Sequence, residues 1–362
     1  MADTETNREA LKASFIAKSG FAGARREALP GDASTRRYER LWLDKGQSLI
    51  LMDQASGLES KPCPMEADEA RRCDMGYNAM ARLAAGRIEA FVACAEFLNA
   101  QGLSAPKIHA LDSENGFLIS EDLGDGLFAR LIEQGTPEEP LYLAAVEALA
   151  QLHKINPPKI LNNNWPLLSY DALALKTGCD LFVEWYPRYG GLKPLSDKAL
   201  SEWYDLWQPI ITKAGMAASV FIHRDYHAEN LLWLPEREGL KRVGMIDFQD
   251  ALLGHPSWDL LSLLQDARRD VSKELETKAL NHYFSVSGII DRTEFMHTYH
   301  ALASLNEARI LGIFARLVYR DHKPKFAQFI PRMWRCLSGN LNTPELAGLK
   351  DWFIRHGFGA NL

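Results

Sequence analysis

The stretch His223-Arg224-Asp225-Tyr226-His227-Ala228-Glu229-Asn230, followed by Ile246-Asp247-Phe248, is the most informative part of this chain. It has the form H-R-D-x-x-x-x-N, with a second aspartate in front of a phenylalanine further on. These two segments offer a carboxylate at Asp225, an amide at Asn230 and another carboxylate at Asp247.

The residues between Asn230 and Asp247 predict a β-hairpin. Two short apolar runs, Leu231–Leu234 and Val243–Ile246, flank the polar segment Pro235–Gly239, which is typical of a turn. An antiparallel hairpin brings its two ends side by side, so Asn230 and Asp247 are expected to converge. Two oxygen ligands at one point suit a hard cation such as Mg²⁺.

Groups of these kinds are what phosphoryl transfer requires. One carboxylate lies beside the acceptor hydroxyl, and an amide with a second carboxylate holds Mg²⁺ against the phosphates. Asp225, Asn230 and Asp247 can fill these roles. Alternatively, His223 and His227, four residues apart, bind zinc or are ordinary surface residues. Neither alternative accounts for the hairpin and its two polar ends, so the kinase-type interpretation is favoured.

The composition is that of an ordinary globular enzyme. Of 362 residues, 47% are hydrophobic and 24% are charged, which suits one large two-lobed domain or two modest domains. The net charge of -6 argues against a general nucleic-acid binder. No signal-peptide core and no run of roughly 20 apolar residues is present, so we expect no membrane association.

The five cysteines contain no C-x-x-C pair, and an odd, scattered set fits reduced thiols in the cytoplasm. No feature of the sequence points to an obligate protein partner.

The order of predicted elements indicates an α+β fold of two lobes. Alternating and apolar runs predict five strands and one helix in the first third of the chain: strands at Arg26–Leu29, Tyr38–Leu43, Ser48–Met52, Lys107–Leu111 and Gly116–Ser120, and a helix at Arg87–Ala100. Leu141–Ile155 has helical spacing, and nearly everything from Ser257 onward is expected to be helical. We therefore predict a strand-rich nucleotide-binding lobe at 1–122 and a helical catalytic and substrate-binding lobe at 123–362.

With these residues in view, the chain resembles the aminoglycoside phosphotransferase and choline kinase family, which shares the protein-kinase-like fold. More narrowly, it resembles bacterial kinases that phosphorylate N-acetylmuramate and N-acetylglucosamine at the anomeric hydroxyl. The segments that carry the resemblance are Gly31–Ser34 with Arg36-Arg37-Tyr38, Leu49–Asp53, Glu121–Asp125, Val220–His227 and Ile246–Ala251. The H-R-D-x-x-x-x-N segment with Asp247 is typical of the kinase-like family, and the first two segments narrow it to the sugar kinases.

The resemblance implies roles for the catalytic segment. Asp225 would orient or deprotonate the acceptor hydroxyl, while Asn230 and Asp247 would bind Mg²⁺. Asp259, in the segment Ser257-Trp258-Asp259-Leu260, would brace the catalytic loop. The alternative for this segment is a helix start, with Ser257 as the N-cap and Asp259 favoured by the helix dipole.

The resemblance also implies a site for ATP. The backbone of Glu121, Asp122 and Leu123 would meet the adenine. Backbone N–H groups of the loop formed by Gly31, Asp32, Ala33 and Ser34 would cover the phosphates as an anion-binding nest. For that loop, the alternative is a plain hairpin turn.

One expected group is missing. Kinases place a lysine on the third strand to bind the nucleotide phosphates, but Ser48–Asp53 contains none. Arg36 and Arg37 are the nearest candidates to supply this charge, and a solvated strand face is the alternative for them. Without the lysine, the helix residue Glu89 is assigned no catalytic role.

Another motif is misleading. Gly124–Ala129 fits the dinucleotide pattern G-x-G-x-x-A, but the acidic strand end that the pattern requires about 20 residues later is absent. We interpret this segment as a connector between the lobes.

The favoured hypothesis is an ATP- and Mg²⁺-dependent kinase of an amino sugar, N-acetylmuramate or N-acetylglucosamine, acting in cell-wall sugar recycling in the cytoplasm. One alternative is a sister kinase of an aminoglycoside or a choline-like alcohol. Another is a nucleotide-binding pseudokinase scaffold, suggested by the missing lysine. The presence of Asp225, Asn230 and Asp247 together argues against a protein that has lost its chemistry.

Overall fold

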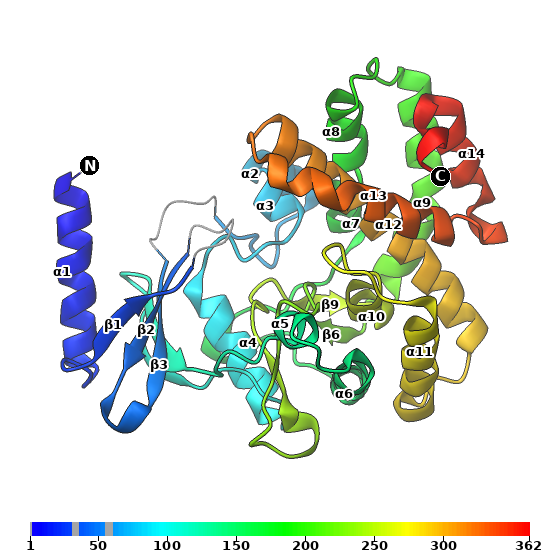
Figure 1. The fold of residues 1–362 in the computed structure, drawn as a ribbon. Helices are drawn as coiled ribbons and strands as arrows, with labels where there is room; N and C mark the ends of the chain where they lie inside the picture. Colours follow the sequence, from blue (N-terminus) through cyan, green and yellow to red (C-terminus); the bar gives the residue numbers. More distant parts are fainter. Residues whose placement is uncertain (1, 31–35, 55–60) are drawn as a thin grey trace. The chain divides into compact units, whose positions relative to one another are not determined.

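The structure is a computed structural model that describes residues 2–30, 36–54 and 61–362 (Figure 1). By its internal contacts the chain divides into two compact units, each made of several stretches. Unit 1 comprises Met1–Ala144, Pro158–Leu167 and Glu229–Ala251, and unit 2 comprises Ala145–Pro157, Leu168–Ala228 and Leu252–Leu362. The lobe boundary at residue 122 stays a prediction.

Unit 1 is built on a five-stranded antiparallel sheet in the order β1-β2-β3-β5-β4. Its strands are β1 (Arg25–Ala28), β2 (Arg37–Trp42), β3 (Ser48–Asp53), β4 (Ile108–Asp112) and β5 (Phe117–Glu121). The unit also contains α2 (Glu69–Met75), α3 (Tyr77–Met80), α4 (Ile88–Ala100) and α5 (Phe128–Glu133). The strands and the α4 helix predicted from the sequence are all present, and their ends differ by at most one residue from the predicted ones.

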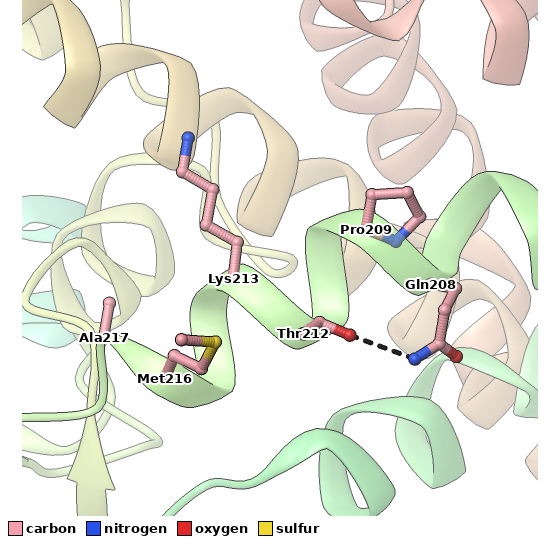
Figure 2. Close-up of a pocket in the computed structure, with 6 residues that line it drawn as sticks. All are labelled: Gln208, Pro209, Thr212, Lys213, Met216 and Ala217. Carbon is pink, nitrogen blue, oxygen red and sulfur yellow. Dashed lines mark hydrogen bonds between the residues drawn. The ribbon is translucent and has the colours of Figure 1, made fainter.

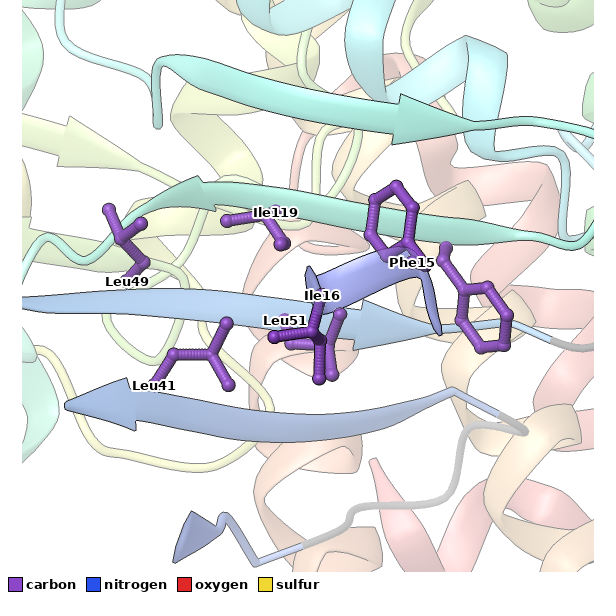
Figure 3. Packing of buried hydrophobic residues seen from close by; sticks show 7 residues of the cluster. Phe15, Ile16, Leu41, Leu49, Leu51 and Ile119 are labelled. Atoms are coloured by element: carbon purple, nitrogen blue, oxygen red, sulfur yellow. The ribbon is translucent and has the colours of Figure 1, made fainter. Parts of the chain in front are cut away.

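One face of this sheet is covered by a helix that the sequence patterns did not reveal, α1 (Ala2–Lys18) (Figure 3). The buried cluster between helix and sheet consists of Phe15, Ile16, Leu41, Leu49, Leu51, Phe117 and Ile119. Side chains alternate between the two faces of a strand, so the odd-numbered residues of β3 point toward the helix. Burying this much apolar surface is the main force that holds α1 in place.

Ion pairs add to that attachment. The Lys12 side chain is only 3% exposed, and its Nζ lies 2.6 Å from Glu39 Oε1 and 3.3 Å from Asp53 Oδ2. The Arg8 guanidinium lies 2.6 Å from the same Asp53 carboxylate. Burial by itself would lower the pKa of Lys12, but its bonds to Glu39 and Glu9 raise it, so the amine stays charged. The charges in α1 are therefore satisfied by strand residues far along the chain.

The helix α6 (Glu138–Leu152) runs from unit 1 into unit 2 and corresponds to the helix predicted at Leu141–Ile155. Unit 2 contains the short antiparallel pair β6 (Val220–Ile222) and β9 (Leu252–Gly254). Its remaining helices are α7 (Ala172–Cys179), α8 (Leu181–Tyr189), α9 (Asp197–Met216), α10 (Ser257–Leu264), α11 (Lys273–Ser287), α12 (Arg292–Tyr319), α13 (Ile330–Asn340) and α14 (Ala347–Phe353). The predicted helical character after Ser257 is confirmed.

The long helix α12 packs closely against α8 because Gly312 has no side chain. A Cβ atom at Gly312 would lie 2.3 Å from the carbonyl carbon of Leu181, where no substituent fits. The five cysteines are free in the structure. Within the residues that the structure describes, no helix combines the length and the apolar character that crossing a bilayer requires.

Candidate active site

The predicted hairpin is present and brings Asn230 and Asp247 to the same end. Strands β7 (Leu231–Trp233) and β8 (Val243–Met245) pair antiparallel, with Leu231 opposite Met245. Beyond the last paired residues, the backbone N–H of Ile246 donates to the carbonyl of Asn230 at 3.1 Å. Since Asp247 is the next residue, Asn230 and Asp247 lie at the same end of the hairpin.

Asp247 is held in an unusual backbone conformation. Its φ of +64° lies in the left-handed region, which is costly for residues other than glycine and is commonest in asparagine and aspartate. Its Oδ1 accepts hydrogen bonds from Arg36 Nη1 at 3.0 Å and from Gln249 Nε2 at 2.9 Å. The side chain is still 41% exposed, so a carboxylate in a fixed position remains accessible to a ligand.

The structure distinguishes the two arginines that could replace the missing lysine. The Arg36 side chain is 16% exposed and lies on Asp247. Burial by itself would lower its pKa, but the neighbouring Tyr38 and Asp247 raise it, so the guanidinium is a permanent charge. Arg37 is an exposed residue opposite Asp53 in the β2–β3 pairing. Arg36 is therefore the better candidate to meet a phosphate, although contact with nucleotide stays a prediction.

The loop that carries Asp225 is braced from below by α10. Asp259 is fully buried, and its two carboxylate oxygens accept the backbone N–H groups of His223 at 2.7 Å and Arg224 at 2.9 Å. The bracing role implied by the resemblance is thus present in unit 2. Ser257 does not cap α10 with its side chain; instead its Oγ lies 2.7 Å from His255 Nδ1.

Burial raises the pKa of Asp259 to about 7, while the two backbone hydrogen bonds act in the opposite direction. The charge of Asp225 raises it further. A carboxylate that titrates near neutrality therefore supports the catalytic loop, which gives the loop a dependence on pH.

The residue before Asp225 is fixed at three points. Arg224 has a φ of +79°, and Asp259 binds its N–H. Its carbonyl accepts a hydrogen bond from Trp258 Nε1 at 3.2 Å, and its guanidinium lies 4.8 Å from the centre of the Tyr170 ring. Strained residues of this kind persist only where the surroundings hold them, and they cluster at functional sites. The loop thus presents Asp225, which is partly exposed, in a defined place.

The side chains of the predicted hinge are engaged within unit 1. Glu121 Oε1 lies 2.6 Å from Arg237 Nη2, on the turn side of the β7–β8 hairpin. Asp122 accepts a hydrogen bond from Ser48 Oγ. It also forms an ion pair with Arg40, whose Nε lies 2.7 Å from Asp122 Oδ2. A Cβ on Gly244 would lie 3.1 Å from Leu123 Cδ1, so that leucine packs on the hairpin. A contact between the backbone of this segment and adenine stays a prediction.

The glycines that resemble a dinucleotide motif have a structural explanation. Trp233 donates its backbone N–H to the carbonyl of Gly126 at 2.7 Å. A Cβ on Gly126 would lie 2.6 Å from the carbonyl oxygen of Trp233, so only glycine fits there. This close approach of two backbones within unit 1 explains the glycine, and the connector role stays a prediction. The four residues Gly31, Asp32, Ala33 and Ser34, predicted to cover the phosphates, lie outside the described residues.

The zinc alternative finds no support in the residues that the structure describes. Among them, no group of three or more His, Cys, Asp or Glu side chains is arranged to hold a metal. His223 is buried, and His227 Nε2 lies 3.2 Å from the guanidinium of Arg268, a cation that would repel a metal ion. The oxygen pair of Asn230 and Asp247 fits Mg²⁺ better, because Mg²⁺ keeps several waters and takes few protein ligands.

Some contacts at the site were not predicted. Gln249 orients Asp247, and Asp250 Oδ1 accepts the backbone N–H of Ala84 at 2.6 Å, which ties the segment after β8 to the turn before α4. Both residues lie within the quoted segment Ile246–Ala251. Gln249 contacts a residue two positions away, whereas the partner of Asp250, Ala84, is distant in sequence. The contact of Arg268 with His227 had no signal in the sequence.

Unit 2 also has an open surface hollow on the C-terminal half of α9 (Figure 2). It is lined by Gln208, Pro209, Thr212, Lys213, Met216 and Ala217. Lys213 is paired with Glu294 at 2.5 Å, and Gln208 donates to Thr212. No residue assigned to chemistry lines the hollow, and we assign it no role.

Comparisons with known proteins also indicate a phosphotransferase. The model of the phosphotransferase enzyme family matches residues 25–295, a range that contains every residue discussed above as a ligand or base. An N-acetylmuramate/N-acetylglucosamine kinase of Caulobacter vibrioides is 56% identical over 97% of this chain and 97% of its own length. An enzyme of the same name from Pseudomonas aeruginosa is 30% identical over 93% of this chain and 90% of its own.

Among solved structures, a choline kinase from Streptococcus pneumoniae superposes with a TM-score of 0.55 at 16% identity, covering 91% of this chain and 99% of that one. At this identity the likeness concerns the fold, and the expected kinase-like α+β fold is confirmed.

Proposed function

This chain belongs to the phosphotransferase enzyme family, and we propose that it transfers the γ-phosphate of ATP, with Mg²⁺, to the anomeric hydroxyl of N-acetylmuramate and N-acetylglucosamine. The observation that carries the choice of sugar is the 56% identity, over 97% of both chains, to a kinase named for these two substrates. The place of action that follows is the cytoplasm of a bacterium, where sugars released from the cell wall are reused.

The chemistry of the acceptor agrees with the groups available. An anomeric hydroxyl is more acidic than a primary alcohol, so a carboxylate such as Asp225 faces a smaller barrier in taking its proton. Asp225 is supported by Asp259 through the backbone of the preceding residues, which holds its position during the transfer. Correct placement supplies most of the rate enhancement in reactions of this type.

Residues of unit 1 would bind the phosphate donor, ATP, and its metal ion. Asn230 and Asp247 would hold Mg²⁺, whose charge offsets that of the phosphates. Arg36, which lies on Asp247, would neutralise a phosphate oxygen and so replace the absent lysine. The intact set of Asp225, Asn230 and Asp247 speaks against the scaffold alternative.

A sister activity on an aminoglycoside or a choline-like alcohol is the remaining alternative. Such acceptors are cations and favour an acidic binding surface. N-acetylglucosamine is neutral and N-acetylmuramate is an anion, so neither requires one. The likeness to choline kinase concerns the fold alone.

The test is direct. The protein is incubated with ATP and Mg²⁺ and, in separate reactions, N-acetylmuramate, N-acetylglucosamine, kanamycin or choline, and ADP release is measured. The position of the phosphate is then located by ³¹P–¹H coupling. We expect turnover with both sugars and coupling to the anomeric proton, and no turnover in EDTA. Phosphate on the 6-hydroxyl, or turnover only with kanamycin or choline, would overturn the proposal.

A further inference from the structure

The loop that follows α10, residues 265–270, touches the catalytic loop inside unit 2. Arg268 Nη1 lies 3.2 Å from His227 Nε2. A guanidinium can only donate, so His227 Nε2 is the acceptor and carries no proton in this contact. His227 is two residues beyond Asp225, and a residue spans at most about 3.6 Å, so their Cα atoms are within about 7 Å. A permanent positive charge is thus held against the catalytic loop, at a residue two positions along the chain from the predicted base.

The same loop contains a buried acceptor. Asp266 is 3% exposed, and its Oδ1 accepts the backbone N–H of Arg268 at 2.8 Å, which fixes the turn. Its other oxygen, Oδ2, is buried and accepts no hydrogen bond from any residue in the described part of the chain. Buried carboxylate oxygens almost always have a donor, so this atom is suited to a hydroxyl or an amide N–H of a ligand.

Nearby charges are already paired. Asp270 binds Arg332 at 2.8 Å and Arg335 at 2.9 Å. Arg332 also donates to the carbonyl of Ala267 and acts electrostatically on Asp266. Arg268, by contrast, directs its guanidinium to His227 of the catalytic loop.

We propose that residues 265–270 form the acceptor subsite, in which Arg268 binds the lactyl carboxylate of N-acetylmuramate and Asp266 Oδ2 accepts a sugar hydroxyl or the acetamido N–H. This inference rests on the proposed function. The lactyl group is attached to C3 of the sugar ring, two ring atoms from the anomeric carbon. A sugar whose C1 hydroxyl meets Asp225 can therefore direct its carboxylate to a neighbouring cation.

The first experiment changes Arg268 to Gln, which keeps a donor for His227 and removes the charge. We expect KM for N-acetylmuramate to rise by about tenfold or more, the scale of a lost charge-assisted hydrogen bond, with KM for N-acetylglucosamine changed by less than about twofold. Arg268→Lys should recover part of the preference. Arg335→Gln removes an equal charge from the adjacent helix and should leave the ratio of the two KM values unchanged.

The second experiment changes the ligand instead of the protein, so it does not depend on how a variant folds. N-acetylmuramate with its carboxyl group esterified should bind the unaltered enzyme about tenfold more weakly than the free acid. Arg268→Gln should bind the two forms equally. A wild-type enzyme that does not distinguish the ester, or an Arg268→Gln variant that loses both sugars to the same extent, would overturn the role of Arg268.

Asp266→Asn tests the second contact. It should raise KM for both sugars by about tenfold and leave KM for ATP unchanged. An unchanged KM for the sugars, or an equal rise for ATP, would count against Asp266. If the wild-type enzyme phosphorylates neither sugar, the proposed function itself fails, whereas turnover of both sugars with an unaltered preference in Arg268→Gln defeats only the subsite.

Discussion

The guanidinium of Arg36 and the carboxylate of Asp247 form an ion pair, 3.0 Å between Nη1 and Oδ1, although 211 residues separate them in the chain. Arg36 lies directly before β2, and Asp247 follows the last strand of the β7–β8 hairpin. The pair therefore joins a predicted metal ligand to the cation that could stand in for the usual lysine.

The ion pair gives the first prediction. Arg36→Ala should raise KM for ATP or lower kcat by about tenfold or more, because the buried charge proposed to neutralise the phosphates is lost. Arg37→Ala is the matched control: it removes the same charge from the adjacent, exposed residue and should change both constants by less than about twofold. Steady-state kinetics and circular dichroism of both variants provide the measurement. Equal effects of the two substitutions would contradict the assignment.

The second prediction concerns the metal. Asp247→Asn keeps a residue that tolerates the left-handed backbone, so it tests the charge without adding strain. We expect ATP to bind this variant with the same weak affinity in Mg²⁺ and in EDTA, whereas the wild type should bind more tightly in Mg²⁺. Asp247→Ala should show the same loss and also a lower stability, since alanine is disfavoured at positive φ. Isothermal titration calorimetry measures the binding, and a wild-type affinity that EDTA leaves untouched would rule out the metal role.

The third prediction isolates the base. Asp225→Asn should lower kcat by about 10²-fold or more, the usual scale for a general base, and leave ATP affinity largely unchanged. Nucleotide affinity is measured by calorimetry and turnover by ADP release with N-acetylglucosamine. A variant with near-normal turnover would remove Asp225 from the mechanism.

The fourth prediction follows from the buried carboxylate beneath the catalytic loop. The pKa of Asp259 is about 7 in the folded protein, against about 3.9 for an unfolded chain, so the folded state binds more protons in between. The contribution of Asp259 to the free energy of unfolding is complete below about pH 3.9, the pKa of the unfolded chain, and is lost as the pH rises through 7. The stability of the wild type relative to Asp259→Asn should therefore fall by about 1.4 kcal/mol per pH unit between pH 5 and 7.

Above pH 7 this difference should level off, because Asp259 is then ionised in both states. Urea unfolding of the two proteins at half-unit pH steps gives the two stability curves. Curves that run parallel from pH 5 to 8 would show that Asp259 does not titrate in this range.

The fifth prediction compares two acidic residues that share one arginine. The Asp122 side chain is 5% exposed and the Arg40 side chain 11%, so Asp122→Asn removes the buried partner of Arg40 and should cost about 3 kcal/mol. Asp125 binds the same guanidinium at 2.8 Å but is 70% exposed, so Asp125→Asn should cost less than about 1 kcal/mol. Urea unfolding measures the free energy of unfolding of both variants. Similar losses would mean that the buried Asp122–Arg40 pair does not stabilise the predicted hinge segment.

Local spacing made much of the site predictable. The hairpin and its two polar ends could be inferred because a strand, a turn and a strand occupy consecutive residues, so the pairing follows from proximity along the chain. The distinction between Arg36 and Arg37 could not be inferred. It depends on strand parity, and an error of one residue in the start of β2 exchanges the two faces of the strand.

Contacts between residues far apart in the sequence could not be predicted either. The charged residues of α1 suggest a solvated segment, yet Lys12 is buried because Glu39 and Asp53 balance it. Likewise, nothing in the segment Gln265–Asp270 reveals that Arg268 reaches His227, because that contact exists only once α10 has packed beneath the catalytic loop.

The position of α1 has a consequence for how the chain behaves when it is shortened. Every residue proposed for catalysis lies beyond residue 30, so a chain that starts after Ser19 retains all of them. It would nevertheless expose Leu41, Leu49 and Leu51 on a bare sheet face and leave Asp53 without Arg8 and Lys12. An uncovered apolar face of this kind tends to associate with its own copies. Precipitation, rather than a slower reaction, is the failure to expect from such a shortened protein.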